Sequence, residues 1–363
     1  MRYILRCCLL CILLPNTGCR SFMAVSFSKH SDGGVYRVSK DKPEQLVRLP
    51  NLNYLIHDSK TDFYYGTISR QIGRNDGTGA VVTLKKHSVK SMKTIQTANT
   101  GGKTPCCLTL SPDRRFLYAV NYTSGDISEF RLRNGLCCRP ARLIRHSGHG
   151  KTSRQRMPHP HFAAFDPAER KLYVCDLGTD QIWIYGWSPE KGVILPCEKK
   201  LQLPPGSGPR HLVFDPSGCI LYCVNELNST VASFFRRSPE EPWHRIKICS
   251  TLTEPLRQGQ TNYPGAIKIT GDGRFILAAN RGHDSIALFE TLGAGNFRLI
   301  RTVPSQGKFP SDILLLGKDE FAAVSHLRSG TVTVFRFDGK KRELTPCSDP
   351  QAIPHAMGLC SGF

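Results

Sequence analysis

Length and composition predict a folded protein with an anionic partner. The chain has 363 residues, of which 40% are hydrophobic, so it can bury the core of one large domain or two ordinary ones, which excludes extensive disorder. Its 49 Lys and Arg residues against 29 Asp and Glu give a formal charge of +20, which favours phosphorylated or carboxylated metabolites, nucleic acid or an acidic membrane surface.

Residues 1–19 have the pattern of a targeting leader. A basic start, MRYILR, precedes the short apolar run CCLLCILLP, which is typical of a cleavable secretory signal and too short to span a membrane. Eleven cysteines remain after the leader, and several lie in apolar runs, where a thiol behaves as a small buried hydrophobe. Free thiols favour the cytoplasm whereas the leader indicates secretion, so the localisation stays open between the two.

Short apolar runs separated by turn residues follow the leader. The segment 21–38, SFMAVSFSKHSDGGVYRV, predicts two strands around a polar turn. The next segment begins at Asn51 with NLNYLIHDSKTDFYYGTIS and closes with GAVVTL, which predicts three strands. Both segments are short, alternating and bounded by Asp, Gly or Ser, as strands of antiparallel sheets are.

Five further segments repeat the second pattern without a gap. Each has 26 residues, begins with proline and breaks its apolar runs with DP, DG or SG, which predicts strand, turn, strand, turn, strand. The looser segment after each unit supplies a fourth strand. The units begin at Pro105, Pro160, Pro209, Pro264 and Pro310.

Four antiparallel strands repeated about every fifty residues are typical of a β-propeller blade. We therefore predict an all-β fold, a single seven-bladed β-propeller over residues 20–363 with four antiparallel strands per blade. Six blades run from Asn51 onward, and the N-terminal blade lacks its first strand. The tail PHAMGLCSGF, from Pro354, is expected to supply that strand, because closure of the ring by a C-terminal strand removes exposed sheet edges.

Comparison of the five units separates residues that the fold requires from residues that are candidates for function. The seventeenth residue of every unit is polar, which predicts a hydrogen bond at the strand end. The second residue and the eighteenth residue vary, and they include Gly265, Ser311 and Leu327. The fold therefore does not require a charge at these two positions. The seventeenth residues are Asn121, Asp176, Asn225, Asn280 and His326.

Four residues at the two variable positions predict a functional site. They are His161, Arg210, Glu226 and Arg281. Because the inner strand of a blade lines the central channel and a hairpin brings both positions to one strand end, these side chains should meet at one channel mouth. Such convergence indicates a binding or catalytic site, and the alternative is a set of solvated strand-end charges.

Long stretches around these residues resemble a known family. PHPHFAAFDP, GPRHLVFDPSG with YCVNELNST, and NYPGAIKITGDGRFILAANRGHDSIALF are similar to the signature segments of the seven-bladed propeller lactonases, which include propeller-type 6-phosphogluconolactonases and related carboxymuconate cycloisomerases. The resemblance covers residues 21–363. It implies a sugar-lactone hydrolase whose site lies at the channel mouth, with the site histidine, two arginines and glutamate of the family at the four positions already selected.

Lactone hydrolysis assigns expected roles to these residues. Glu226 between arginines should stay ionised and suits a general base, while His161 suits the proton donor to the leaving oxygen, and the two roles are exchangeable. Arg210 and Arg281 suit a phosphate, a carboxylate or the developing oxyanion. No cofactor or metal is expected. The neighbours expected to contact the substrate are His159, His211, Asn225 and Asn280.

The basic segment 139–156 has six Lys and Arg residues and no acid. It either steers a small anionic lactone toward the mouth or is a solvated loop. A cycloisomerase acting on a diacid and a non-enzymatic interaction scaffold remain alternatives to the lactonase. Nucleic acid is not expected as a partner because the segment lacks interleaved aromatic residues, and no membrane partner is expected for residues 20–363.

Overall fold

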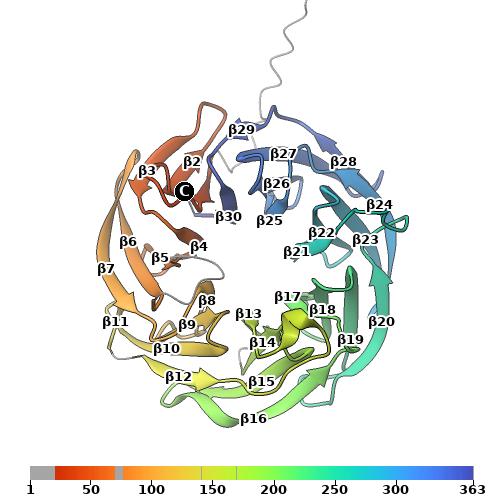
Figure 1. The fold of residues 1–363 in the computed structure, drawn as a ribbon, viewed down its shortest axis with the longest axis horizontal. Coiled ribbons are helices and arrows are strands. Elements are labelled where there is room, and N and C mark those ends of the chain that lie inside the picture. The colour runs from red at the N-terminus through yellow and green to blue at the C-terminus, as the bar shows by residue number, and fades with distance from the viewer. Residues whose placement is uncertain (1–20, 70–76, 140, 169, 363) are drawn as a thin grey trace, which may run out of the picture.

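The fold is a closed ring of seven antiparallel sheets, which confirms the predicted seven-bladed β-propeller. The structure is a computed structural model that describes residues 21–362 except 70–76, 140 and 169, so the predicted leader lies outside the described residues. Figure 1 shows the sheets arranged around a central axis. Among the described residues the one helical element is the 3-10 turn η1 (Ser153–Gln155), and none of them forms a helix able to cross a membrane.

Within each blade the strands succeed one another from the channel to the rim. The N-terminal blade contains β30 (Ala356–Cys360), β1 (Phe22–Ser26), β2 (Gly34–Val38) and β3 (Glu44–Arg48). The next contains β4 (Leu52–Asp58), β5 (Phe63–Ile68), β6 (Ala80–Ser88) and β7 (Ser91–Asn99). The third contains β8 (Pro105–Leu110), β9 (Phe116–Asn121) and β10 (Asp126–Arg133), with β11 (Leu136–Cys137) and β12 (Arg142–Arg145) sharing the outer place.

The remaining four blades follow the same order. The fourth contains β13 (Pro160–Phe165), β14 (Lys171–Asp176), β15 (Gln181–Ser188) and β16 (Gly192–Gln202). The fifth contains β17 (Pro209–Phe214), β18 (Ile220–Asn225), β19 (Thr230–Phe235) and β20 (His244–Ser250), and the sixth β21 (Tyr263–Ile269), β22 (Phe275–Arg281), β23 (Ser285–Gly293) and β24 (Asn296–Pro304). The seventh contains β25 (Pro310–Leu316), β26 (Phe321–His326) and β27 (Thr331–Asp338), with β28 (Glu343–Pro346) and β29 (Gln351–Ala352) outside.

The two ends of the chain close the ring, as predicted. Strand β30 pairs antiparallel with β1, and Ala24 lies opposite Leu359. The opening residue of this inner strand is Ala356, opposite Ser26, and not Pro354 as the sequence comparison suggested. The tail thus enters the sheet two residues later than expected.

The core lies between neighbouring blades. On β14, Leu172 and Val174 pack toward the third blade, whereas Tyr173 and Cys175 pack toward the fifth, because successive side chains of a strand point to opposite faces. All eleven cysteines in the described part of the chain are free thiols.

The recurring polar residue at the seventeenth position belongs to the scaffold, as predicted. All five copies are fully buried. Asn121 donates to Asp126 Oδ1 over 2.7 Å, and Asn280 donates to the backbone oxygen of Thr251 over 2.9 Å. These bonds satisfy polar groups that would otherwise be costly to bury.

Candidate active site

Every inner strand has a β-bulge near its start. The pairing with the second strand skips one residue in six blades and two, Gly265 and Ala266, in the sixth blade. A bulge leaves its extra residue outside the ladder and re-aims the side chain. The bulge residues are Asn53, Cys106, His161, Arg210, Gly265, Ala266, Ser311 and Met357, and all but Gly265 and Ala266 line one cavity.

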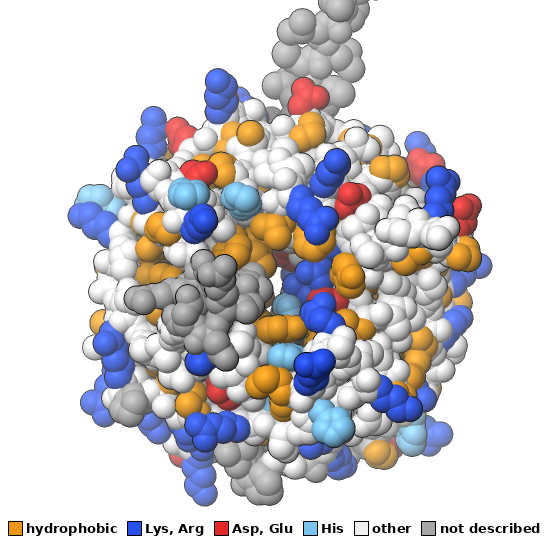
Figure 2. Space-filling model, viewed as in Figure 1, with side chains coloured by type: hydrophobic (Ala, Val, Ile, Leu, Met, Phe, Trp, Pro, Cys, Tyr) orange, Lys and Arg blue, Asp and Glu red, His pale blue; other side chains and the backbone are white. Residues whose placement is uncertain are grey.

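This cavity lies at the channel mouth and has a volume of about 340 Å³, which suits a small metabolite. Figure 2 shows the hollow at the centre of the ring with basic, acidic and histidine side chains inside it. The structure brings His161, Arg210, Glu226 and Arg281 together in its wall. Gly265 makes room for this arrangement, because a Cβ there would lie 3.1 Å from Arg281 Nε.

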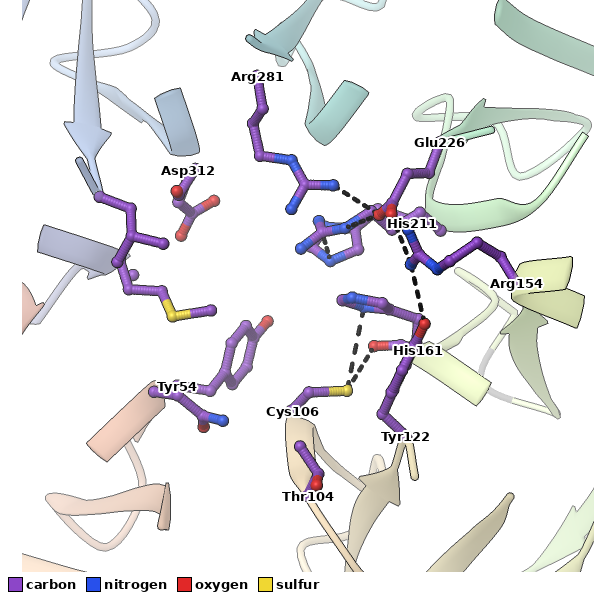
Figure 3. A pocket seen from close by; sticks show the side chains of 16 residues that line it. Tyr54, Thr104, Cys106, Tyr122, Arg154, His161, His211, Glu226, Arg281 and Asp312 are labelled. Atoms are coloured by element: carbon purple, nitrogen blue, oxygen red, sulfur yellow. Dashed lines mark hydrogen bonds and ion pairs between the residues drawn. The ribbon is translucent and has the colours of Figure 1, made fainter. Parts of the chain in front are cut away.

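Glu226 is the centre of an ion-pair cluster, drawn in Figure 3. It follows β18 directly, and its Oε2 accepts a hydrogen bond of 2.5 Å from Arg281 Nη2 at the end of β22. Arg210 Nε lies 3.1 Å from the same oxygen. Arg154 Nη2 donates to Oε1 over 3.2 Å. The expected Arg210–Glu226 pair therefore exists, within a larger cluster.

The cluster keeps Glu226 ionised. Burial alone would raise the pKa of this carboxyl, but the guanidiniums of Arg281 and Arg210 outweigh burial and lower its pKa to about 2. Burial and the charge of Arg281 lower the pKa of Arg210 to about 10. Both groups stay charged at neutral pH. A carboxylate with so low a pKa is a weak base, which argues against the expected role of Glu226 as general base.

His161 is a neutral polar group in the cavity wall. Removal from bulk water and the charge of Arg210 lower the pKa of this imidazole well below 6.5. The ring is therefore uncharged at pH 7, which favours the exchanged assignment with His161 as the proton acceptor. Its Nδ1 lies 4.0 Å from the Sγ of Cys106, and burial raises the pKa of that thiol far above its usual value, so the thiol is neutral as well.

His211 lines the same cavity, next to Arg210 on β17. The Arg210 Nη1 donates to its Nε2 over 3.0 Å, which requires an imidazole with an unprotonated Nε2. Burial, followed by the charge of Arg210, lowers the pKa of His211 well below 6.5. The ring stacks on Phe162, with centroids 4.6 Å apart. Of the four expected substrate-contact residues, it is the one that faces the cavity.

Comparison with known proteins identifies the family of this chain. Residues 24–360 match the family described as "Lactonase, 7-bladed beta-propeller". The chain belongs to this family. It is 26% identical to a 6-phosphogluconolactonase of Bacillus subtilis (strain 168) over 343 residues, which cover 92% of this chain and 95% of that protein.

Solved structures share the fold. A putative 6-phosphogluconolactonase from Bacteroides fragilis has a TM-score of 0.83 at 23% identity and covers 95% of this chain and 99% of its own. A periplasmic gluconolactonase from Pseudomonas aeruginosa has a TM-score of 0.82 at 22% identity, with 93% and 98% covered. At these identities the structures are evidence for the propeller alone.

Three expected substrate contacts of this lactonase family member do not face its cavity. Asn225 and Asn280 are fully buried, and Asn225 donates to Thr230 Oγ1 over 2.9 Å; their expected substrate role is corrected to a scaffold role. His159 is not in the cavity wall either. Its ring stacks on Tyr122, with centroids 4.5 Å apart, and its Nδ1 bonds the Tyr122 backbone oxygen over 2.9 Å.

Comparison of the repeats missed several residues that line the cavity. Tyr122 holds the eighteenth position of its unit, the same position as Glu226. It was not selected because the comparison looked for charged residues and histidine, and the tyrosine ring is largely apolar. Tyr54 and Asp312 stand directly after bulge residues, as His211 does, and reach the cavity from there. Arg154 lies in the basic segment, where no repeat marks its place. Within the part of the chain that the structure describes, no three His, Cys, Asp or Glu side chains are grouped to hold a metal ion.

Proposed function

We propose that this protein hydrolyses an anionic sugar lactone, with 6-phosphogluconolactone as the first candidate. The observation that carries the proposal is a neutral histidine, His161, in a small cavity beside the guanidiniums of Arg210 and Arg281. An uncharged base next to cationic donors suits attack of water on a carbonyl group. The name of the Bacillus subtilis relative supports the choice of lactone.

In the proposed reaction His161 accepts a proton from the water that attacks the lactone carbonyl carbon. Negative charge develops on the carbonyl oxygen, where the donors of Arg210 and Arg281 stabilise it. The bond from the carbonyl carbon to the ring oxygen then breaks, and the imidazolium returns the proton to the ring oxygen. Glu226 favours the transient imidazolium, because its negative charge raises the pKa of His161. The product is a hydroxy acid that ionises at neutral pH.

The first test is hydrolysis of freshly generated 6-phosphoglucono-δ-lactone by the full chain, corrected for spontaneous ring opening. The His161→Asn variant is expected to lower kcat/KM by ~10²- to 10⁴-fold, the usual contribution of a general base. His355→Asn is the matched control, because His355 is exposed and has a positive φ of 48°, which asparagine tolerates.

Two results would overturn the proposal. A folded wild type that accelerates no lactone would direct attention to a cycloisomerase or an interaction scaffold. A folded His161→Asn variant with wild-type kcat/KM would remove His161 as the base. Far-UV circular dichroism and the unfolding midpoint establish that each variant is folded before its activity is compared.

A further inference from the structure

A short segment at the cavity mouth, residues 146–157, connects β12 to β13 and contains η1. We call it the mouth strap. The sequence left open whether the basic segment around it is a solvated loop. In the structure part of that segment forms β12, paired with β10, and the mouth strap brings Arg154 into the cavity wall.

Buried contacts fix the mouth strap at both ends. At its start, His146 Nδ1 and Asp176 Oδ2 lie 2.6 Å apart with both side chains fully buried, and the His146 ring stacks on Trp183, with centroids 4.1 Å apart. Near its end, the fully buried Gln155 donates to Asp180 Oδ1 over 2.7 Å. The residue between these anchors that reaches the cavity is therefore held in place before a ligand arrives, which lowers the entropy cost of binding.

Arg154 differs from the other two arginines of the cavity in exposure. Its side chain is 49% exposed, against 6% for Arg210 and 12% for Arg281. Figure 3 shows its guanidinium entering the cavity beside Glu226. Arg154 therefore stands at the open side of the cluster, where a substrate enters.

Arg154 also has hydrogen-bond donors that are available to a ligand. Its Nη2 donates to the Tyr122 hydroxyl over 3.1 Å and to Glu226, while its Nε and Nη1 have no hydrogen-bond partner among the described residues. Arg281 by contrast uses Nε on the Tyr263 backbone oxygen and Nη2 on Glu226. A guanidinium with two donors available is suited to a group with several acceptor oxygens, above all a phosphate.

We propose that Arg154 binds the phosphate of a phosphorylated sugar lactone and so gives the site its preference for phosphorylated over neutral substrates. This inference rests on the proposed function. Arg210 and Arg281 remain close to the reacting carbonyl beside His161, and Arg154 holds the charged substituent at the mouth. Arg154 is thus a binding and specificity residue, not a catalytic one.

The test compares kcat/KM of the full chain on 6-phosphoglucono-δ-lactone and on neutral glucono-δ-lactone. Arg154→Gln is expected to lower the value for the phosphorylated lactone ~10- to 100-fold more than the value for the neutral one, the usual scale of a charge-assisted hydrogen bond. Arg154→Lys should recover part of the loss. Added salt should raise KM for the phosphorylated lactone more in the wild type than in Arg154→Gln.

Arg156→Gln is the matched control. Arg156 is an exposed arginine of the same mouth strap and does not line the cavity, so this variant removes the same charge at a distance from the proposed contact. The inference is overturned if Arg156→Gln reproduces the loss in kcat/KM for the phosphorylated lactone, or if Arg154→Gln lowers kcat/KM for both lactones equally. A wild type with a higher kcat/KM for the neutral lactone would overturn it as well. A wild type that hydrolyses neither lactone overturns the proposed function itself, and the two failures are thereby distinct.

Discussion

At the scale of single residues, the charge of the cavity depends on Glu226. One carboxylate contacts the guanidiniums of Arg154, Arg210 and Arg281. The arginines repel one another, so they share a small volume only because this anion lies between them. Glu226 thereby positions the cationic donors, which explains why a residue expected to be a base has the pKa of a permanent anion.

Glu226→Gln is expected to destabilise the protein at pH 7 by about 3 kcal/mol, because it leaves buried guanidiniums without their anion. The pKa of Glu226 falls from an ordinary 4.5 to about 2 on folding. A depressed pKa stabilises the fold above the ordinary value, and this stabilisation is lost as the pH falls from there toward 2. The free energies of unfolding of wild type and variant, measured with urea, should therefore differ less at pH 3 than at pH 7.

The matched control is Glu240→Gln, at an exposed ion pair with Arg170, where a change within about 0.5 kcal/mol is expected. If wild type and Glu226→Gln differed equally in free energy of unfolding at pH 7 and pH 3, the lowered pKa of Glu226 would be contradicted.

His161 sets the expected pH dependence of catalysis. Because its pKa lies well below 6.5, the neutral, active imidazole persists on acidification, and kcat/KM should stay level through pH 6.5 and fall only at lower pH. Arg210 contributes to this depression, so Arg210→Met should raise the pKa of His161 and move the acid limb to higher pH. The role of His161 would be refuted if kcat/KM of the wild type fell with a midpoint at pH 6.5. It would also be refuted if Arg210→Met left the midpoint of the acid limb unchanged.

At the scale of elements, the β-bulge of each inner strand decides which side chains enter the cavity. The gap-free repeats predicted the strands and turns, because alternating apolar runs and DP, DG or SG turns have a direct local cause. They did not predict the bulge, because every copy has it and an insertion common to all copies produces no gap. Tyr54 and Asp312 were missed for the same reason, because each directly follows a bulge residue and reaches the cavity from there.

The mouth strap marks the other limit of prediction. Its basic composition was visible, but its path depends on tertiary contacts such as His146 with Asp176 and Gln155 with Asp180. No periodicity in residues 146–157 encodes these pairs. The four residues chosen by comparing repeats were brought together because repeat symmetry converts sequence position into a place on the ring, whereas Arg154 has no counterpart in another blade.

At the scale of the whole molecule, closure makes the last strand part of the core. Leu359 lies close to the chain end and is 8% exposed, packed with Phe22 and Val334. Leu359→Ala is expected to lower the free energy of unfolding by about 2–4 kcal/mol, as for a buried leucine, measured by denaturant unfolding. Leu292→Ala, at a leucine that is 54% exposed, should change it by less than about 0.5 kcal/mol. Equal, small effects would indicate a frayed terminus.

The bulges of the inner strands have a consequence for how the sequence of this protein can change over time. Asn53, Cys106, His161, Arg210, Ser311 and Met357 stand outside the strand ladder and line the cavity, so the backbone pairing of the sheets does not dictate their side chains. The residues that maintain the ring and those that line the cavity are therefore largely different sets. A descendant of this chain can exchange its substrate through a few substitutions at the axis and inherit the scaffold unchanged.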